Sequence, residues 1–337
     1  MKSKKKVFLT GAAGLLGSHI TRELLLRNYF VVAFIETGKE PTTLFGLDDV
    51  ALVYGDILNE KEVEAASKNC DYIIHAAANT TVMPARSEII NKINIIGTQN
   101  IIDAAHKNKA ARLIYIGSAN TFGFGDLKNP GNETKPYGCG KFGLDYMDSK
   151  LEAHKCVLDA VKTKNLPAVI VCPTFMLGKY DSKPGSGAMI VSVHSQKLPG
   201  YSKGGRNYIY ASDAAVAVVN AIEFGRIGEA YILGNQNMNY KTAFNLIAKT
   251  IGVKPPRISM PGPVVLLYGA VCTCINKLTR KAMPINIPMA KIANEGFYYD
   301  CSKAINELKL PQTPIDVAIK ECFLWLKQEG LLQNNKS

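Results

Sequence analysis

The 337-residue sequence predicts an α/β fold in which a doubly wound parallel sheet carries a smaller C-terminal α/β lobe. Short, continuous apolar runs alternate with longer segments of helical periodicity, which is typical of strands covered by helices on both faces. A glycine-rich turn joins the first apolar run to the first helical segment. After Pro173, turn-rich segments interrupt the alternation, which indicates that the chain leaves the sheet there.

The expected elements follow this alternation in order. Strands are predicted at Lys6–Thr10, Val31–Ile35, Ala51–Tyr54, Tyr72–His75, Arg112–Gly117 and Ala168–Cys172. Helices are predicted over Leu15–Arg27, Glu60–Asn69, Ser87–Lys107 and Phe142–Lys164. Right-handed crossovers between parallel strands then place the helices on both faces of one sheet.

Two later strands are interpreted as a return to this sheet. The first lies in "NYIYASDAAVAVVNAIEFG" and leads into a helix with Ser212 or Asp213 as N-cap; the second is Glu229–Gly234. The main domain is therefore expected to comprise residues 1–173 and 205–234. Residues 174–204 and 235–330 are expected to form the smaller lobe.

Composition excludes several classes of protein. The apolar fraction of 47% suits a large core, and no stretch approaches the ~20 apolar residues of a spanning helix. The basic start lacks a signal peptide's apolar region, and the eight cysteines are dispersed without a C-x-x-C pair. We therefore expect a cytoplasmic protein without a metal site. The net charge of +12 is spread along the chain without interleaved aromatic residues, so nucleic acid is not an expected partner.

The turn "FLTGAAGLLGSHI" lies between the first strand and the first helix. Glycines there allow a tight turn and a close approach of the backbone to a pyrophosphate, which rests on the positive end of the helix. The main domain is thus expected to bind a dinucleotide, and the lobe to bind the substrate. The turn residues expected to contact the dinucleotide are Gly11, Ala13, Gly14, Leu15, Leu16 and Gly17.

Acidic residues after the second and third strands suit the adenosine half. Glu36 lies 19 positions after Gly17, where a carboxylate accepts hydrogen bonds from the ribose and repels a 2′-phosphate. This favours NAD, with NADP left as an alternative because Lys39 lies close by. Asp56, followed by Ile57 in "YGDI", reaches the adenine amine in one interpretation and forms an Asx turn or helix cap in the other.

The order of several motifs indicates a family. "TGAAGLLG", "GDI", "HAAA", "NIIGTQN", "IGSANTFG", "YMDSK" and "CPTFMLG" occur along residues 6–235 in the order found in extended short-chain dehydrogenases/reductases, the NAD-dependent epimerase/dehydratase superfamily. "CPTFMLGKYDSKPGSGAMI" and "GRIGEAYILG" most resemble its dihydroflavonol 4-reductase and 3β-hydroxysteroid dehydrogenase-like branch. The last hundred residues resemble that branch only weakly.

The spacing in "YMDSK" has a chemical interpretation. Tyr146 and Lys150 are four residues apart and share a helix face. A free phenol titrates near ~10, and a nearby ammonium lowers that pKa towards the range of a neutral-pH base. The resemblance implies that Tyr146 is the catalytic acid/base, that Lys150 is its electrostatic partner and ribose anchor, and that Ser118 binds the substrate oxygen.

The resemblance assigns further residues around the nicotinamide. Asn94 either orders the site or is a buried amide that satisfies helix backbone. Pro173 is expected near the nicotinamide, and His75 is expected to be a packed core histidine. Three small residues leave room beside the cofactor: Ala76, Ala77 and Ala78.

Three reactions use this core, and the sequence separates them. Dehydratases carry an Asp-Glu pair where this chain has Ala119 and Asn120, so dehydration is disfavoured. The leading hypothesis is an NAD(P)-dependent oxidoreductase acting on a secondary alcohol or ketone of a small apolar or cyclic substrate, contacted by Ser118, Asn120, Thr174 and Arg206.

Two alternatives stay open. A nucleotide-sugar epimerase would hold a diphosphate with Arg206 of "GGRNYIYASD". The residues Phe175–Leu177, which replace an expected asparagine, favour an apolar substrate instead. A non-catalytic NAD(P)-binding scaffold or sensor is disfavoured because serine, tyrosine and lysine are all present.

The segment "PGPVVLLYGAVCTCI" (Pro261–Ile275) is followed by Lys277, Arg280 and Lys281. An apolar helix with basic flanks suits peripheral contact with an anionic membrane. The favoured interpretation is a buried helix that walls the substrate pocket. The resemblance also implies a homodimer formed through two helices.

Overall fold

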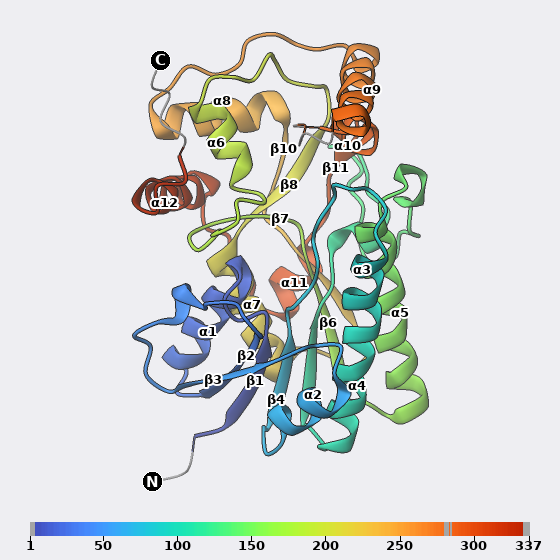
Figure 1. The fold of residues 1–337 in the computed structure, drawn as a ribbon, viewed down its shortest axis with the longest axis vertical. Helices are drawn as coiled ribbons and strands as arrows, with labels where there is room; N and C mark the ends of the chain where they lie inside the picture. The colour runs from blue at the N-terminus through green and yellow to red at the C-terminus, as the bar shows by residue number, and fades with distance from the viewer. Residues whose placement is uncertain (1–3, 280–282, 284, 333–337) are drawn as a thin grey trace.

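The computed structural model describes residues 4–279, 283 and 285–332. Its larger sheet is parallel, with strand order β3-β2-β1-β4-β5-β6-β9, and helices cover both faces (Figure 1). The strands are β1 (Lys6–Thr10), β2 (Phe30–Glu36), β3 (Val50–Gly55), β4 (Tyr72–His75), β5 (Arg112–Ile116), β6 (Ala168–Pro173) and β9 (Ala230–Leu233). The predicted doubly wound α/β fold is confirmed.

Two apolar clusters hold the helices against this sheet. Successive strand residues point to opposite faces, so Phe8 joins one cluster while Val7 and Leu9 join the other. One face carries α2 (Glu60–Ser67), α4 (Gly97–Lys107) and α5 (Asp145–Lys164). The other carries α1 (Leu15–Leu26), α7 (Ala211–Phe224) and α11 (Ser302–Glu307).

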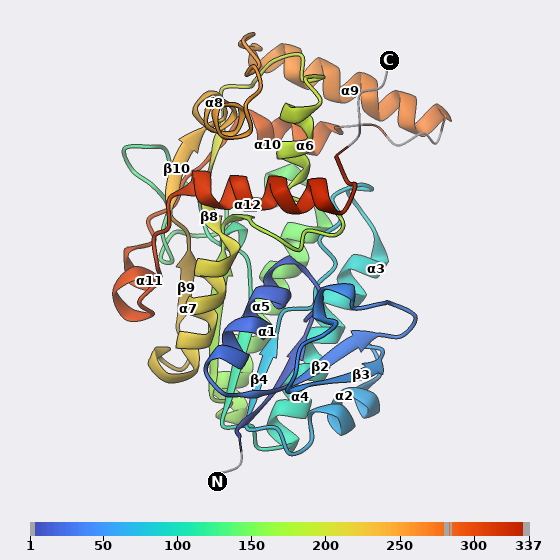
Figure 2. The same cartoon turned by 90° about the vertical axis from the view of Figure 1, so that its left-hand side faces the viewer.

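A second sheet forms the centre of the smaller lobe (Figure 2). Its strands are β7 (Phe175–Leu177), β8 (Gly205–Tyr210), β10 (Gln236–Asn239) and β11 (Gly296–Phe297), and β8 pairs with each of the others. A third apolar cluster packs helices against it, namely α6 (Ala188–His194), α8 (Tyr240–Ile251) and α12 (Ile315–Gln328).

The expected return of the chain to the main sheet is half right. β9 pairs with β6 as predicted, but the prediction that β8 joins that sheet is wrong. β7 follows β6 directly in the chain and lies outside the main sheet. β8 pairs with β7 in parallel, so β8 belongs to the second sheet. The helix that follows begins at Ala211, earlier than predicted, and Tyr210 is its N-cap. The division of the chain into two domains stays a prediction.

Two predicted helices begin or continue differently. The segment expected as one helix over Ser87–Lys107 contains α3 (Glu88–Asn91), a π-helical turn over Lys92–Ile96, and α4. The helix expected from Phe142 begins at Asp145, because Gly143 has a φ of 67° and ends a preceding 3-10 turn, Gly140–Phe142. Further short 3-10 turns cover Thr42–Leu44 and Ala119–Thr121.

The apolar helix α9 (Gly262–Thr279) lies at the outer end of the smaller lobe, against α10 (Ile287–Ala293) (Figure 2). The prediction that it is buried is wrong, because 17% of its residues are buried. Within the described residues, it is the one helix long and apolar enough to cross a membrane by length and composition.

Candidate active site

The candidate site lies at the carboxyl ends of the main-sheet strands. From β1 the sheet extends through β2 and β3 in one direction and through β4, β5 and β6 in the other. Such a switch in winding leaves a crevice outside the strand ends, where α/β proteins bind their ligands. The glycine turn after β1 and the residues after β4 both open into this region.

The glycine turn is too tight for larger residues at two positions. Gly11 has a φ of 69°, and an added Cβ would lie 2.7 Å from the backbone of Ala76 and of Ala77. A Cβ on Gly17 would lie 2.0 Å from the carbonyl oxygen of Gly11. Since α1 begins after Gly14 without a side-chain cap or an acidic residue in its first turn, its first N–H groups suit an anion. These residues fit the pyrophosphate of a dinucleotide.

The end of β4 is fixed by a buried histidine. Nδ1 of His75 lies 2.8 Å from the hydroxyl of Thr10, and its Nε2 lies 3.1 Å from the hydroxyl of Thr98. The Thr10 hydroxyl also accepts the N–H of Ala77 at 3.1 Å. Burial lowers the pKa of His75 to about 3. The prediction of a packed core histidine is therefore confirmed, and the residue holds Ala76–Ala78 beside the glycine turn.

The residues predicted for the adenosine half lie at neighbouring strand ends. Glu36 ends β2 with its side chain exposed. Asp56 Oδ1 accepts the N–H of Leu58 at 2.9 Å, so Asp56 forms an Asx turn, the second of its two predicted roles. Its Oδ2 takes no part in this bond. The carbonyl oxygen of Ile57 accepts a bond of 2.9 Å from Asn100, whose side chain thereby fixes this loop.

The predicted catalytic residues meet where β5 ends and α5 begins. Ser118 follows β5, is 5% exposed, and lies close enough to Tyr146, on the first turn of α5, to act on the pKa of its phenol. Nζ of Lys150 donates a bond of 2.6 Å to the carbonyl oxygen of Ile116 and lies 4.7 Å from the ring centre of Tyr115. Burial lowers the pKa of Lys150 to about 8.

The sequence predicted that Lys150 lowers the pKa of Tyr146, and the structure shows other groups acting on this phenol. Burial raises the pKa of Tyr146 above its usual value, while the Ser118 side chain and the charge of Arg206 act to lower it. The ammonium of Lys150 is directed to the carbonyl of Ile116, so Arg206 is the cation that acts on the phenol here.

Asn94 connects two parts of the site from within the π-helical turn. Its Oδ1 accepts the N–H of Asn79 at 2.7 Å, and its Nδ2 donates to the carbonyl of Asn79 and to Ser149 Oγ of α5. These bonds join the loop after β4 to α5 and do not satisfy the backbone of its own helix. A π-turn is frequently found at functional sites because it redirects one side chain.

Arg86 contacts the helix that carries Tyr146, and the sequence did not single it out. Its guanidinium forms ion pairs of 2.6 Å with Asp145 and 3.0 Å with Asp148, the residues on either side of Tyr146 in α5. Asp145 also accepts the N–H of Ser87 at 2.6 Å. Only the acidic residues at both sides of the tyrosine were visible in the sequence, and nothing there identified their distant partner.

Arg206 of β8 lies in a cage of aromatic side chains. Its Nε donates to Tyr240 Oη at 3.0 Å, and its guanidinium carbon lies 5.1 Å from the ring centre of Phe175 and 5.5 Å from that of Phe297. Among the described residues, no Asp or Glu forms an ion pair with it.

The remaining predicted residues lie nearby but already have partners. The hydroxyl of Thr174 donates to Asn207 Oδ1 at 2.8 Å, and the N–H of Asn120 donates to Ser118 Oγ at 3.3 Å. Pro173 is buried at the end of β6.

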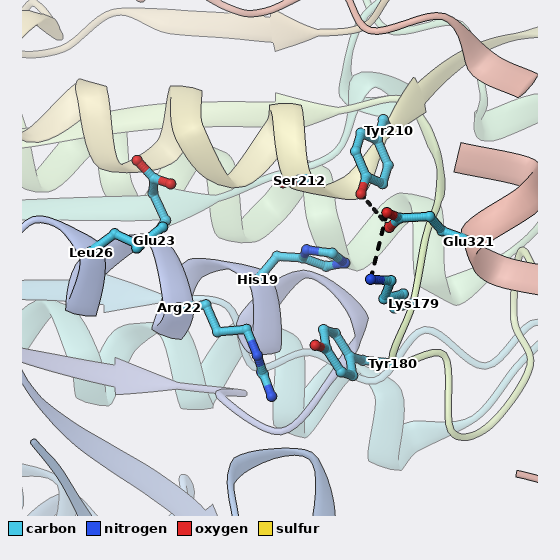
Figure 3. A pocket seen from close by; sticks show the side chains of 9 residues that line it. All are labelled: His19, Arg22, Glu23, Leu26, Lys179, Tyr180, Tyr210, Ser212 and Glu321. Atoms are coloured by element: carbon cyan, nitrogen blue, oxygen red, sulfur yellow. Dashed lines mark hydrogen bonds and ion pairs between the residues drawn. The ribbon is translucent and has the colours of Figure 1, made fainter. Parts of the chain in front are cut away.

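A separate pocket of about 180 Å³ lies between α1 and the smaller lobe (Figure 3). Lys179 and Glu321 pair with one another in it at 3.5 Å, and Tyr210 also donates to Glu321. It contains none of the predicted site residues, and we do not assign the substrate to it. Its lining residues are His19, Arg22, Glu23, Leu26, Lys179, Tyr180, Tyr210, Ser212 and Glu321.

Comparisons with known proteins agree with this geometry. Residues 7–234 match the model of the NAD dependent epimerase/dehydratase family. A provisionally named dihydroflavonol 4-reductase of Synechocystis sp. is 27% identical, over 97% of this chain and 96% of its own. A 2-alkyl-3-oxoalkanoate reductase of Shewanella oneidensis is 28% identical, over 88% of this chain and 80% of its own. The crystal structure of gox2253 superposes with a TM-score of 0.86 at 27% identity and covers 98% of this chain and 100% of that one.

Proposed function

The chain belongs to the NAD dependent epimerase/dehydratase family, and from that premise we propose that it exchanges a hydride between NAD and a secondary alcohol or ketone. One observation carries this proposal: Ser118, Tyr146 and Lys150 gather at the end of β5, beside a glycine turn that fits a pyrophosphate. The two relatives named as reductases support it.

Bound NAD would supply the hydride-accepting nicotinamide ring. The chain would hold it through backbone N–H groups of the glycine turn and through the carboxylates of Glu36 and Asp56. The cofactor-binding residues we propose are Gly11, Ala13, Gly14, Leu15, Leu16, Gly17, Glu36, Asp56, Ile57, Ala76, Ala77, Ala78, Asn94, Tyr146, Lys150 and Pro173.

Side chains of the protein would carry out the proton transfer. Ser118 would orient the substrate oxygen, and Tyr146 would take the hydroxyl proton in oxidation and return it in reduction. Burial holds the free phenol protonated, a state that suits the donor role in ketone reduction. Oxidation needs the phenolate, which Arg206 and Ser118 favour.

Arg206 narrows the substrate class. A partly buried guanidinium without a carboxylate partner in the described residues is a favourable site for an anionic group. The relative named a 2-alkyl-3-oxoalkanoate reductase acts, by its name, on a ketone that carries a carboxylate. We therefore propose a substrate with an apolar body, a carbonyl or hydroxyl for Tyr146 and a carboxylate for Arg206.

A kinetic comparison of 3-oxo acids with their methyl esters tests this function. NADH consumption is expected with both, and kcat/KM is expected to be higher for the acid because the ester lacks the charge. If the protein binds NADH and turns over no ketone or secondary alcohol, it is a scaffold or sensor and the proposal is wrong.

Nucleotide-sugar epimerisation is the second candidate, because a diphosphate could also occupy the position beside Arg206. The aromatic contact between Arg206 and Phe175 disfavours it, since it places an apolar ring beside the guanidinium. Conversion of a nucleotide sugar into its 4-epimer without net NADH change would establish this reaction.

A further inference from the structure

The outer surface of α9 exposes a continuous apolar stripe. Val265, Gly269 and Cys272 are its buried residues, and a Cβ on Gly269 would lie 2.6 Å from that of Ala290 of α10. Beside this packed side, large apolar residues are exposed at helical spacing along the whole helix. They are Val264 (48%), Leu267 (67%), Tyr268 (41%), Val271 (47%), Ile275 (37%) and Leu278 (85%).

This stripe is long and uninterrupted. From Val264 to Leu278 it extends about 21 Å at 1.5 Å per residue. Lys277 is the one charged residue in α9. Soluble monomers rarely expose contiguous apolar patches of such extent unless the patch contacts a partner or a membrane.

The sequence that flanks α9 on both sides carries charge of a single sign. Between Glu229 and Glu295 the sequence has no Asp or Glu and eight Lys or Arg, so this segment supplies +8 of the net +12. Six of these cations are exposed in the described residues: Lys241, Lys249, Lys254, Arg257, Lys277 and Lys291. The other two, Arg280 and Lys281, lie outside the described residues.

We propose that α9 docks this protein on an anionic membrane surface. The apolar stripe would enter the boundary between headgroups and acyl chains, and the basic residues that flank α9 in the sequence would contact the lipid phosphates. A second copy of the chain is a poorer occupant of the same face, because pairing would bring two segments of charge +8 together.

The helix is expected to lie along the membrane surface and not to cross it. Its 18 residues span about 27 Å, slightly less than the ~30 Å hydrocarbon core. Crossing would also separate Gly269 from Ala290 of α10, whereas lying flat keeps that contact.

Docking would face a hollow beside the site towards the lipid. A pocket of about 360 Å³ lies between Leu266 of α9, Lys291 of α10 and Phe142, and the Glu295 carboxylate in its lining is paired with Lys141 at 2.7 Å. The ring of Phe142 is 5.7 Å from that of Phe297, which in turn contacts Arg206. This consequence rests on the proposed function: an amphiphilic substrate would enter from the membrane towards Arg206. The docking itself depends only on α9 and its charges.

Vesicle flotation of the full chain tests the docking. The protein is expected to float with vesicles of phosphatidylcholine and phosphatidylglycerol at low salt, and about tenfold less with phosphatidylcholine alone or at high salt. The variant Leu267→Glu/Leu278→Glu is expected to lose about tenfold in binding to the mixed vesicles. Leu26→Glu, a matched substitution of an exposed leucine on α1 (82%), is expected to bind as the unsubstituted chain does.

Two outcomes would overturn the proposal. The first is equal flotation of the Leu267→Glu/Leu278→Glu and Leu26→Glu variants. The second is a dimer in sedimentation that the double substitution dissociates, combined with no vesicle binding, which would assign the stripe to a second copy. Turnover of a water-soluble 3-oxo acid is measured in the same samples. The double variant is expected to keep it, so a failure of docking is distinguished from a failure of the proposed function.

Discussion

The ammonium of Lys150 lies 2.6 Å from the carbonyl oxygen of Ile116, two residues before Ser118. This bond ties the second turn of α5 to the end of β5, and it fixes the loop of Ser118 against the helix of Tyr146. The same ammonium lies over the ring of Tyr115, which is 5.8 Å from the ring of His75 on β4. A packed series of side chains thus connects α5 with the strand end beside the glycine turn.

The phenol of Tyr146 is expected to be indispensable for turnover. In Tyr146→Phe, kcat should fall about a thousandfold, because general acid–base catalysis contributes about 10²–10⁴. NADH binding should stay within about threefold, since the ring is retained. Steady-state kinetics and NADH fluorescence titration measure the two quantities. A Tyr146→Phe variant with normal kcat would remove the phenol from the mechanism.

The buried ammonium of Lys150 predicts a pH-dependent stability. The unfolded side chain titrates at 10.5 and the folded one at about 8, so the unfolded chain binds more protons between these values. The free energy of unfolding attributable to Lys150 therefore rises from about pH 8 to about pH 10.5, and the destabilisation is fully present below pH 8. Relative to Lys150→Met, the chain should gain about 3 kcal/mol across this window. Urea denaturation of both proteins at each pH measures it; a constant difference would show that Lys150 has an ordinary pKa.

Two glycines of the turn, Gly14 and Gly17, are expected to respond differently to substitution by alanine. Gly17→Ala should destabilise the fold by about 1–3 kcal/mol, because its Cβ would lie 2.0 Å from the Gly11 carbonyl oxygen. Gly14→Ala is the matched control: its Cβ would meet that oxygen at 3.4 Å, so stability should change by less than about 0.5 kcal/mol. Equilibrium unfolding measures both variants. Equal destabilisation of the two would contradict the close approach at Gly17.

Removal of the Asn94 side chain, which joins the loop after β4 to α5, is expected to lower both stability and kcat. In Asn94→Ala the N–H and carbonyl of Asn79 lose their partner, and unfolding should become easier by about 1–3 kcal/mol. Because the loop after β4 is no longer joined to α5, kcat should fall while KM changes little. Asn100→Ala is a control that removes one bond, to Ile57, away from Tyr146. It should lower stability and leave kcat unchanged.

Sequence reasoning was most successful where the pattern is local. Strands such as β1 and β4 were predicted at their observed bounds, because a buried parallel strand is an apolar run ending at a turn. Strand pairing was harder to predict. β8 is an apolar run that fits either sheet, and its pairing with β7 places it in the second one. The exposed face of α9 was missed because composition does not reveal whether an apolar helix is covered.

Within the site, the glycine turn and the Tyr146–Lys150 pair were visible as motifs, and Ser118 was joined to them through the family resemblance. The partners that set the electrostatics were not visible. Lys150 donates to a backbone carbonyl, which has no sequence signature, and Arg206 acts on Tyr146 from β8, 60 positions along the chain. The cation nearest in sequence is therefore not the cation that lowers the phenol pKa.

Arg206 consequently predicts two separable effects. In Arg206→Gln, kcat/KM for a 3-oxo acid should fall about 10–100-fold, because a charge-assisted hydrogen bond contributes about 1.5–3 kcal/mol. The matching methyl ester should lose much less. Since the charge of Arg206 lowers the pKa of Tyr146, the rise of alcohol oxidation with pH should also move to higher pH in the variant. Arg206→Lys, which keeps a cation, is expected to restore the pH profile better than it restores acid binding, because lysine lacks the planar guanidinium. If acid and ester lose equally and the profile does not move, Arg206 only supports the fold through Tyr240, Phe175 and Phe297.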